Sequence, residues 1–175
     1  MRFAIVLSAP LLAACIPIPV SIDLGTPAQS GPVTPWPATA HCPMPERGPR
    51  DAARLQGLIN AQRAKAGLRP VALSPDLSEV SRKHACDNAA RQATGHEGSD
   101  GATLADRLRR KGIAFRQAAE NTGLGFASPE AAMAFWMASP DHRANILSPR
   151  MTQIGIGQAD GSPRPAWVVN FILPQ

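Results

Sequence analysis

The sequence has 175 residues, which is enough for one domain with a sizeable core and too few for two comfortable ones. With 44% hydrophobic but only 5% aromatic residues and no tyrosine, it predicts a globular core built mainly from aliphatic side chains. The net charge of +5 allows weak attraction to anionic surfaces. We exclude nucleic acid as a partner, because the densest basic stretch, DRLRRKG at 106–112, is typical of a solvated helix face with few aromatic residues nearby.

The first residues of the chain have the layout of an export signal. MRFAIVLSAPLLAAC places one arginine and a short apolar run before small residues and Cys15, which favours a secretory signal over a membrane span. The letters LAAC resemble a bacterial lipobox, which implies cleavage before Cys15 and attachment of acyl chains such as palmitate to that cysteine, a stable anchor. An ordinary signal cleaved after LAA is the alternative. We therefore predict a lipoprotein signal peptide at 1–14.

A tether is predicted to follow the lipidated cysteine, over residues 15–50. This segment holds nine of the 18 prolines and shows no helical or strand periodicity. Proline-rich segments are extended, so about 35 residues could hold a domain up to roughly 100 Å from a bilayer. Ile16 follows the cysteine where an aspartate is absent, and in the lipoproteins this resembles that favours the outer membrane, on its periplasmic side. Residues 51–175 are expected to form the domain.

The chain has three cysteines, an odd number for an exported protein. If Cys15 carries lipid, Cys42 and Cys86 remain and can form a disulfide that closes a loop of about 45 residues. Two buried free thiols are the alternative, because the sequence does not show the geometry that a disulfide requires. We favour the disulfide.

Helix signals come in succession after Asp51. Apolar residues at helical spacing predict a first helix at 51–66, with Gly67 as a left-handed cap. Serine or threonine caps open three more predicted helices, at 74–92, 103–111 and 128–139. A short helix is expected to begin within SPDHRANIL.

Strand signals dominate the end of the chain. TQIGIGQA alternates isoleucine with glycine, AWVVNFIL is a β-branched and aromatic run, and AENTGLG is a third candidate strand. Helices followed by strands predict an α+β domain in which helices pack on a small antiparallel sheet.

Several segments in order carry a resemblance to a known family: LINAQRAKAGLRPVALSPDLSEVSRKHACDNAA, GHEGSDGATLADRLRRKG, AENTGLGF, SPEAAMAFWMASPDHRANILSPRMTQIGIGQA and WVVNF. Over about 55–171 the sequence resembles the bacterial branch of the CAP superfamily (SCP-like domains), which includes cysteine-rich secretory proteins, venom antigens and plant pathogenesis-related proteins. The resemblance implies a three-layer α-β-α sandwich, while the fold by itself does not dictate a function.

The resemblance also implies a cavity built around two histidines and acidic residues. The matching residues are His96 of GHEG, Glu120 of AEN and His142 of SPDH, and Ser139 stands where eukaryotic members often have a glutamate. Two imidazoles and a carboxylate could hold zinc or another divalent cation with one position left open. The alternative is a structural cluster in which both histidines bind Glu120, which would raise the pKa of each imidazole.

Three other polar residues are assigned structural roles. His84 is interpreted as a core histidine on the apolar side of its helix, and Asp100 and Asn145 as residues that cap or stabilise loops.

No catalytic motif of a hydrolase, nucleotide-binding or dinucleotide-binding enzyme is present in the sequence. We therefore expect a monomeric, non-enzymatic binding module, anchored to a membrane through Cys15, that recognises an envelope protein, lipid or polymer. One alternative is a metal-assisted hydrolase of peptide or envelope polymer, with Glu120 and His142 as the weak catalytic candidates. The other is a lipid-binding carrier, which would need an apolar groove between helices.

Overall fold

The structure of the protein is a computed structural model that describes residues 42 and 45–175. The predicted signal peptide, Cys15 and the tether up to His41 lie outside the described residues. No helix in the described part of the chain is long and apolar enough to cross a membrane.

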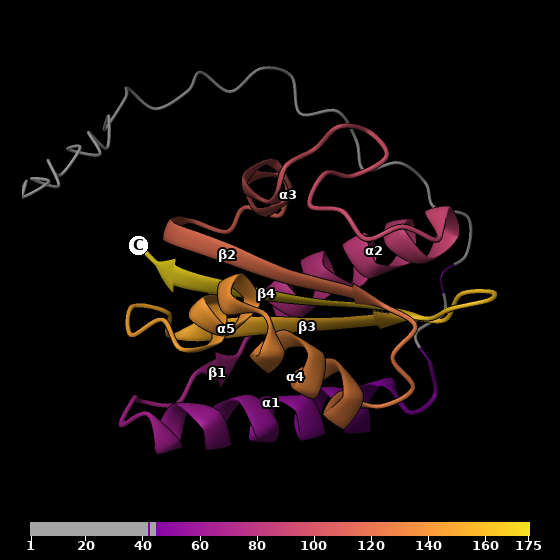
Figure 1. Cartoon of the computed structure of the whole chain (residues 1–175). Coiled ribbons are helices and arrows are strands. Elements are labelled where there is room, and N and C mark those ends of the chain that lie inside the picture. Colours follow the sequence, from indigo (N-terminus) through magenta and orange to yellow (C-terminus); the bar gives the residue numbers. More distant parts are fainter. Residues whose placement is uncertain (1–41, 43–44) are drawn as a thin grey trace, which may run out of the picture. The chain divides into compact units, whose positions relative to one another are not determined.

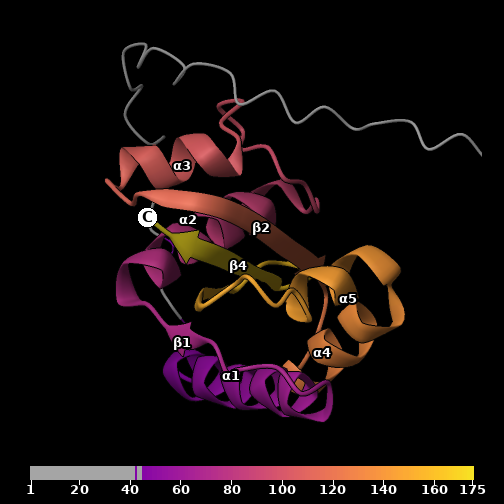
Figure 2. The same cartoon turned by 90° about the vertical axis from the view of Figure 1, so that its left-hand side faces the viewer.

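The described chain forms five helices and four strands, arranged in three layers. In order they are α1 (Gly48–Lys65), β1 (Ala72–Leu73), α2 (Pro75–Arg91), α3 (Leu104–Arg110), β2 (Phe115–Leu124), α4 (Pro129–Ala138), α5 (Pro140–Ile146), β3 (Gln153–Ala159) and β4 (Ala166–Pro174). Figures 1 and 2 show α2 and α3 on one face of the sheet and α1, α4 and α5 on the other. The predicted α+β class and α-β-α sandwich are confirmed.

The sheet differs from the prediction in one respect, because it is mixed rather than purely antiparallel. Its strand order is β1-β3-β4-β2, and β4 pairs antiparallel with both β3 and β2. The two-residue strand β1 pairs parallel with the start of β3, at Gln153 and Ile154. A two-residue strand leaves no readable alternation of apolar and polar residues, which explains why the sequence did not reveal it.

Helix boundaries follow the predicted caps closely. Ser74, Thr103 and Ser128 each accept a hydrogen bond from a backbone N–H in the first turn of α2, α3 and α4. Ser139 lies at the start of α5 but its side chain makes no capping hydrogen bond, so the capping role expected for it is wrong. The first helix starts at Gly48, three residues before the expected domain boundary, with Pro49 in its first turn.

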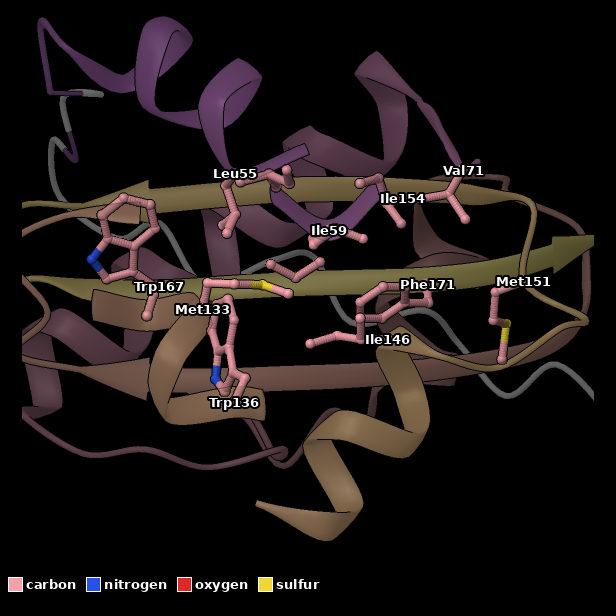
Figure 3. Close-up of a cluster of buried hydrophobic side chains, with 13 residues drawn as sticks. Leu55, Ile59, Val71, Met133, Trp136, Ile146, Met151, Ile154, Trp167 and Phe171 are labelled. Atoms are coloured by element: carbon pink, nitrogen blue, oxygen red, sulfur yellow. The ribbon is translucent and has the colours of Figure 1, made fainter. Parts of the chain in front are cut away.

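The largest buried cluster lies between the sheet and the helices α1, α4 and α5 (Figure 3). It consists of thirteen buried residues: Leu55, Ile59, Val71, Ala132, Met133, Trp136, Ile146, Met151, Ile154, Ile156, Trp167, Val169 and Phe171. Trp136 is fully buried, and its indole N–H donates to the carbonyl of Thr122, which ties α4 to β2. The core therefore orients α4 and α5 against the end of β2, where the candidate site lies.

Two glycines of β3 allow α2 to pack directly on the opposite face of the sheet. A Cβ atom at Gly155 would overlap the backbone of Leu77, and one at Gly157 would overlap the backbone of Ser81 and Arg82. The alternation of isoleucine and glycine in QIGIGQA thus serves close helix-sheet packing on one side and the core on the other.

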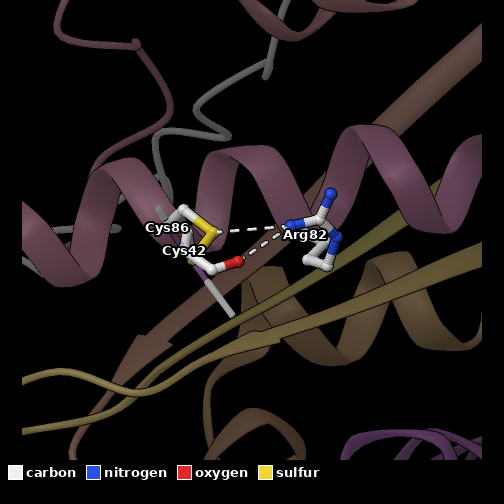
Figure 4. The surroundings of a disulfide bond; sticks show 3 residues. All are labelled: Cys42, Arg82 and Cys86. Atoms are coloured by element: carbon white, nitrogen blue, oxygen red, sulfur yellow. Dashed lines mark hydrogen bonds between the residues drawn. A yellow bond between two sulfur atoms is a disulfide. The ribbon is translucent and has the colours of Figure 1, made fainter. Parts of the chain in front are cut away.

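The predicted disulfide between Cys42 and Cys86 is present (Figure 4). The two Cα atoms lie 5.9 Å apart, within the range that a disulfide spans. Arg82 on the same helix donates to the carbonyl of Cys42, at 3.3 Å. The bond ties Cys42, from the predicted tether, to the middle of α2.

Candidate functional site

A buried ion pair between Glu120 and Arg107 lies at the centre of the site. Glu120 comes from β2 and Arg107 from α3, and the two side chains are only 3% and 1% exposed. Arg107 Nη2 donates to Glu120 Oε2 at 2.6 Å, while Nη1 donates to the carbonyls of His96 and Ala102. Such charge-assisted bonds are the strong class of hydrogen bond. Arg107 therefore joins α3, β2 and the loop that carries His96.

Two histidines surround the other carboxylate oxygen of Glu120. His96 Nδ1 lies 3.0 Å from Oε1, in hydrogen-bond contact, and its side chain is 63% exposed. His84 is fully buried, and its Nε2 lies 2.8 Å from the carbonyl of Gly95 and 3.6 Å from Oε1. Because a carbonyl only accepts, the Nε2 of His84 carries the proton. Its Nδ1 is buried without a hydrogen-bond partner in the described chain, so the predicted core histidine is satisfied on one side only.

His142 reaches the site from α5 without contacting Glu120. The Nδ2 of Asn121 donates to the carbonyl of His142 at 3.0 Å, and the Nδ2 of Asn145 donates to the Oδ1 of Asn121 at 2.9 Å. The imidazole lies beside the ring of Phe135, with 5.8 Å between ring centroids. Asn145 thus joins α5 to β2, a role close to the expected stabilisation of a loop.

The two neighbouring loops are organised by Asp100. Its carboxylate accepts from the backbone N–H of Ala102 at 3.0 Å and from Arg110 at 2.5 Å. Asp100 therefore stabilises the loop that follows His96, in agreement with its assignment from the sequence.

A cavity of about 610 Å³ opens above the ion pair. His96 and His142 both line it, together with Phe135 of α4 and Arg164 of the loop before β4. The complete lining is Gln92, Ala93, Thr94, His96, Thr122, Gly123, Leu124, Phe126, Phe135, His142 and Arg164. No carboxylate belongs to this set of described residues, so arginine and the imidazoles are the only ionisable groups on the wall.

The histidines differ in the direction of their pKa shifts. The hydrogen bond to Glu120 raises the pKa of His96, whereas burial lowers the pKa of His84 and of His142. The charge of His96 lowers the pKa of His142 further. The expectation that the carboxylate would raise the pKa of both cavity histidines therefore holds for His96 and is wrong for His142, because His142 does not contact Glu120.

The arrangement does not fit the predicted metal-ligand set of His96, His142 and Glu120. Both oxygens of Glu120 already face Arg107 or His96, and Glu120 does not line the cavity. Among the described residues no three His, Cys, Asp or Glu side chains form a group that could hold a metal ion. Two imidazoles fall short of the three protein ligands typical of a zinc site. Zinc or another divalent cation at the two histidines stays a prediction.

Two further sequence assignments are corrected by the site. Ser139 does not line the cavity, because its place at the junction of α4 and α5 lies outside the lining. DRLRRKG is not a uniformly solvated face, since Arg107 is buried against Glu120. The signal for Arg107 was its spacing, three residues after Leu104 and one before the buried Leu108, on the inward side of α3.

A three-layer α-β-α domain with a histidine-lined cavity beside the end of β2 defines the SCP-like class of domain. The family model for the cysteine-rich secretory protein (CAP) family matches residues 56–171, and the chain belongs to this family.

Relatives and solved structures agree with this assignment. YkwD of Bacillus subtilis (strain 168) is 33% identical over 115 residues, which covers 66% of this chain and 44% of YkwD. The membrane protein YlbC of the same organism is 30% identical over 119 residues, or 68% of this chain and 33% of YlbC. The chain thus spans less than half the length of these curated relatives.

Two solved structures show the same fold. An extracellular SCP-domain protein from Bacillus anthracis superposes with a TM-score of 0.67 at 26% identity, over 75% of this chain and 45% of that one. An outer surface protein of Borrelia burgdorferi superposes with a TM-score of 0.70 at 18% identity, over 77% of this chain and 100% of that one.

Proposed function

We propose that this protein is an extracytoplasmic, lipid-anchored CAP-domain protein that acts by binding a ligand in the His96 cavity rather than by catalysis. The observation that carries the proposal is the state of Glu120, whose carboxylate is buried and paired with Arg107 and His96. A general base must reach the proton that it removes, and Glu120 lies beneath the cavity wall instead of on it. The same pairing argues against a hydrolase that uses Glu120 as its base.

The lining of the cavity favours a small anionic ligand with an aromatic or apolar part. Arg164 and His96 supply positive charge or hydrogen-bond donors, while Phe126 and Phe135 supply apolar surface. The rings of Phe126 and Phe135 lie 5.0 Å apart, and Phe135 is 49% exposed. A volume of about 610 Å³ is in the range of small-molecule sites. An acidic headgroup or an acidic fragment of an envelope polymer has this chemistry.

Support for the extracytoplasmic location comes from the signal at the start of the chain and from relatives. The Bacillus anthracis structure is that of an extracellular protein, and YlbC is a membrane protein. The Cys42–Cys86 disulfide also suits an oxidising compartment. We place the protein at the periplasmic side of the outer membrane, anchored through Cys15.

The cavity can be tested with 1-anilinonaphthalene-8-sulfonate, a small probe that combines aromatic rings with a sulfonate. We expect the full chain to bind one dye molecule saturably, as measured by fluorescence titration. Arg164→Ala and Phe135→Ala should each weaken binding by roughly three- to tenfold, because each removes a charge or an apolar contact worth about 1 kcal/mol. Both side chains are exposed, so neither change removes a core contact.

Arg150→Ala is the matched control, since Arg150 is exposed and lies outside the cavity. Equal affinity in wild type, Arg164→Ala and Phe135→Ala would reject the cavity as the ligand site. Adding zinc to the same titration tests the metal prediction as well. An ion held by His96 and His142 should change dye affinity in wild type and not in His142→Ala.

The anchor predicts a change of cell fraction. In a Gram-negative host, the full chain should sediment with outer-membrane fractions and carry acyl chains at Cys15, detected by mass spectrometry of the N-terminal peptide. Cys15→Ser should lose the modification, because the thiol is the atom that takes the lipid, and Ile16→Asp should keep the lipid but shift to the inner membrane. Wild-type protein found unmodified in the soluble fraction would contradict the anchor.

A further inference from the structure

A second hollow, of about 420 Å³, opens at the edge of the sheet between the start of α1 and the first half of α2. Its wall is mainly apolar and includes Ala52, Leu73, Ile156 and Trp167. It shares no residue with the His96 cavity. The hollow is therefore a separate feature of the domain.

The hollow coincides with an open strand edge. β1 covers β3 only at Gln153 and Ile154, and within residues 42 and 45–175 no strand pairs with the rest of this edge. The carbonyl of Ile154 accepts from the backbone of Ser74, and the N–H of Ile156 donates to the hydroxyl of Ser78. Backbone groups alternate along a strand, so those of Gln158 point to the same outer edge.

The side chain of Gln158 gives the hollow an unmatched polar group. Gln158 lines the hollow and is only 4% exposed. Its Nε2 and Oε1 atoms are both buried, and neither has a hydrogen-bond partner among the residues that the structure describes. Buried amide groups are normally paired, since leaving them unpaired is unfavourable. A ligand that fits must offer an acceptor and a donor together, beside an apolar body.

We infer that this hollow binds an extended, apolar peptide segment of a partner protein, which adds a short strand to the open edge of β3. A peptide backbone presents N–H and C=O groups in alternation, which matches both the strand edge and the amide of Gln158. Its apolar side chains would pack against Ala52, Leu73 and Trp167. An acyl chain would fill the apolar space but leave the strand edge and Gln158 unpaired.

The test uses a fluorescein-labelled, amidated peptide of alternating threonine and valine, six residues long, in anisotropy titrations with the full chain. Two further peptides carry N-methyl groups on alternate amides, one set on each edge of the extended backbone. Only one edge of an added strand faces β3. We therefore expect one methylated peptide to lose roughly tenfold or more in affinity and the other to bind as the parent does.

Gln158→Leu provides a test on the side of the protein. Leucine has a similar size and no polar atoms, so the variant should bind the parent peptide at least about fivefold more weakly while its melting temperature equals or exceeds that of wild type. Gln117→Leu, on β2 and outside both hollows, is the control and should bind as wild type does. The inference is overturned if the parent peptide does not bind, if both methylated peptides bind equally well, or if sodium dodecanoate binds the hollow more tightly than the peptide.

Discussion

Replacing Arg107 by methionine is expected to lower the free energy of unfolding by about 3–5 kcal/mol, measured by urea denaturation of the full chain. The change removes the guanidinium that pairs with Glu120 at 2.6 Å and leaves a carboxylate that is 3% exposed. Removing one partner of a buried pair is costly because the remaining charge stays out of water without compensation. His96 and His84 compensate Glu120 only in part, since burial disfavours the charged form of His84.

A double-mutant cycle separates the pair from its surroundings. Glu120→Gln alone should also destabilise the protein, whereas Arg107→Met combined with Glu120→Gln should be less destabilising than the sum of the two single changes. Arg109→Met is the matched control on the same helix. Its partner Asp106 is exposed, so its loss should cost less than about 1 kcal/mol. Similar values for Arg107→Met and Arg109→Met would show that the buried pair contributes no special stability.

The same variant links stability to the candidate site. Arg107 donates to the carbonyl of His96 as well as to Glu120, so its loss should release the loop that carries His96. We expect Arg107→Met to weaken dye binding in the cavity even at temperatures where the protein remains folded. Unchanged dye affinity in folded Arg107→Met would mean that the pair supports the fold without positioning the site.

Removal of the disulfide should have an effect of comparable size. The bond closes a loop with a sequence separation of 44 residues, and in the chain-entropy model a loop of that length contributes about 4 kcal/mol by restricting the unfolded chain. Cys42→Ala combined with Cys86→Ala should therefore lower the free energy of unfolding by up to roughly 4 kcal/mol. Cys86 is 4% exposed and packs against Ala89 and Val168, so alanine there also removes a small apolar contact.

Reductant distinguishes the bond from that packing loss. Dithiothreitol should destabilise the wild-type chain nearly as much as the double alanine change does, and it should leave the double variant unaffected. A wild-type unfolding midpoint that does not move on reduction would show that the loop is already restricted in the unfolded chain.

Local features of the sequence predicted most of the fold. Ser74, Thr103 and Ser128 mark helix starts because a capping side chain acts on backbone groups within its own turn. The strand runs at 152–159 and 166–173 were readable because each strand carries its own alternation or β-branched content. The disulfide followed from the count of cysteines, and the family resemblance placed His96, Glu120 and His142 near one cavity.

The sequence by itself therefore determined the helices, the main strands, the disulfide and the family to which the chain belongs. Only the tertiary structure decided that Glu120 is paired with Arg107, that His142 stays apart from it, and that Gln158 faces a hollow at an open strand edge. The physical reason is the range of the interactions. Caps and alternation act between residues a few positions apart, whereas the partner of a buried charge or amide depends on which elements pack together.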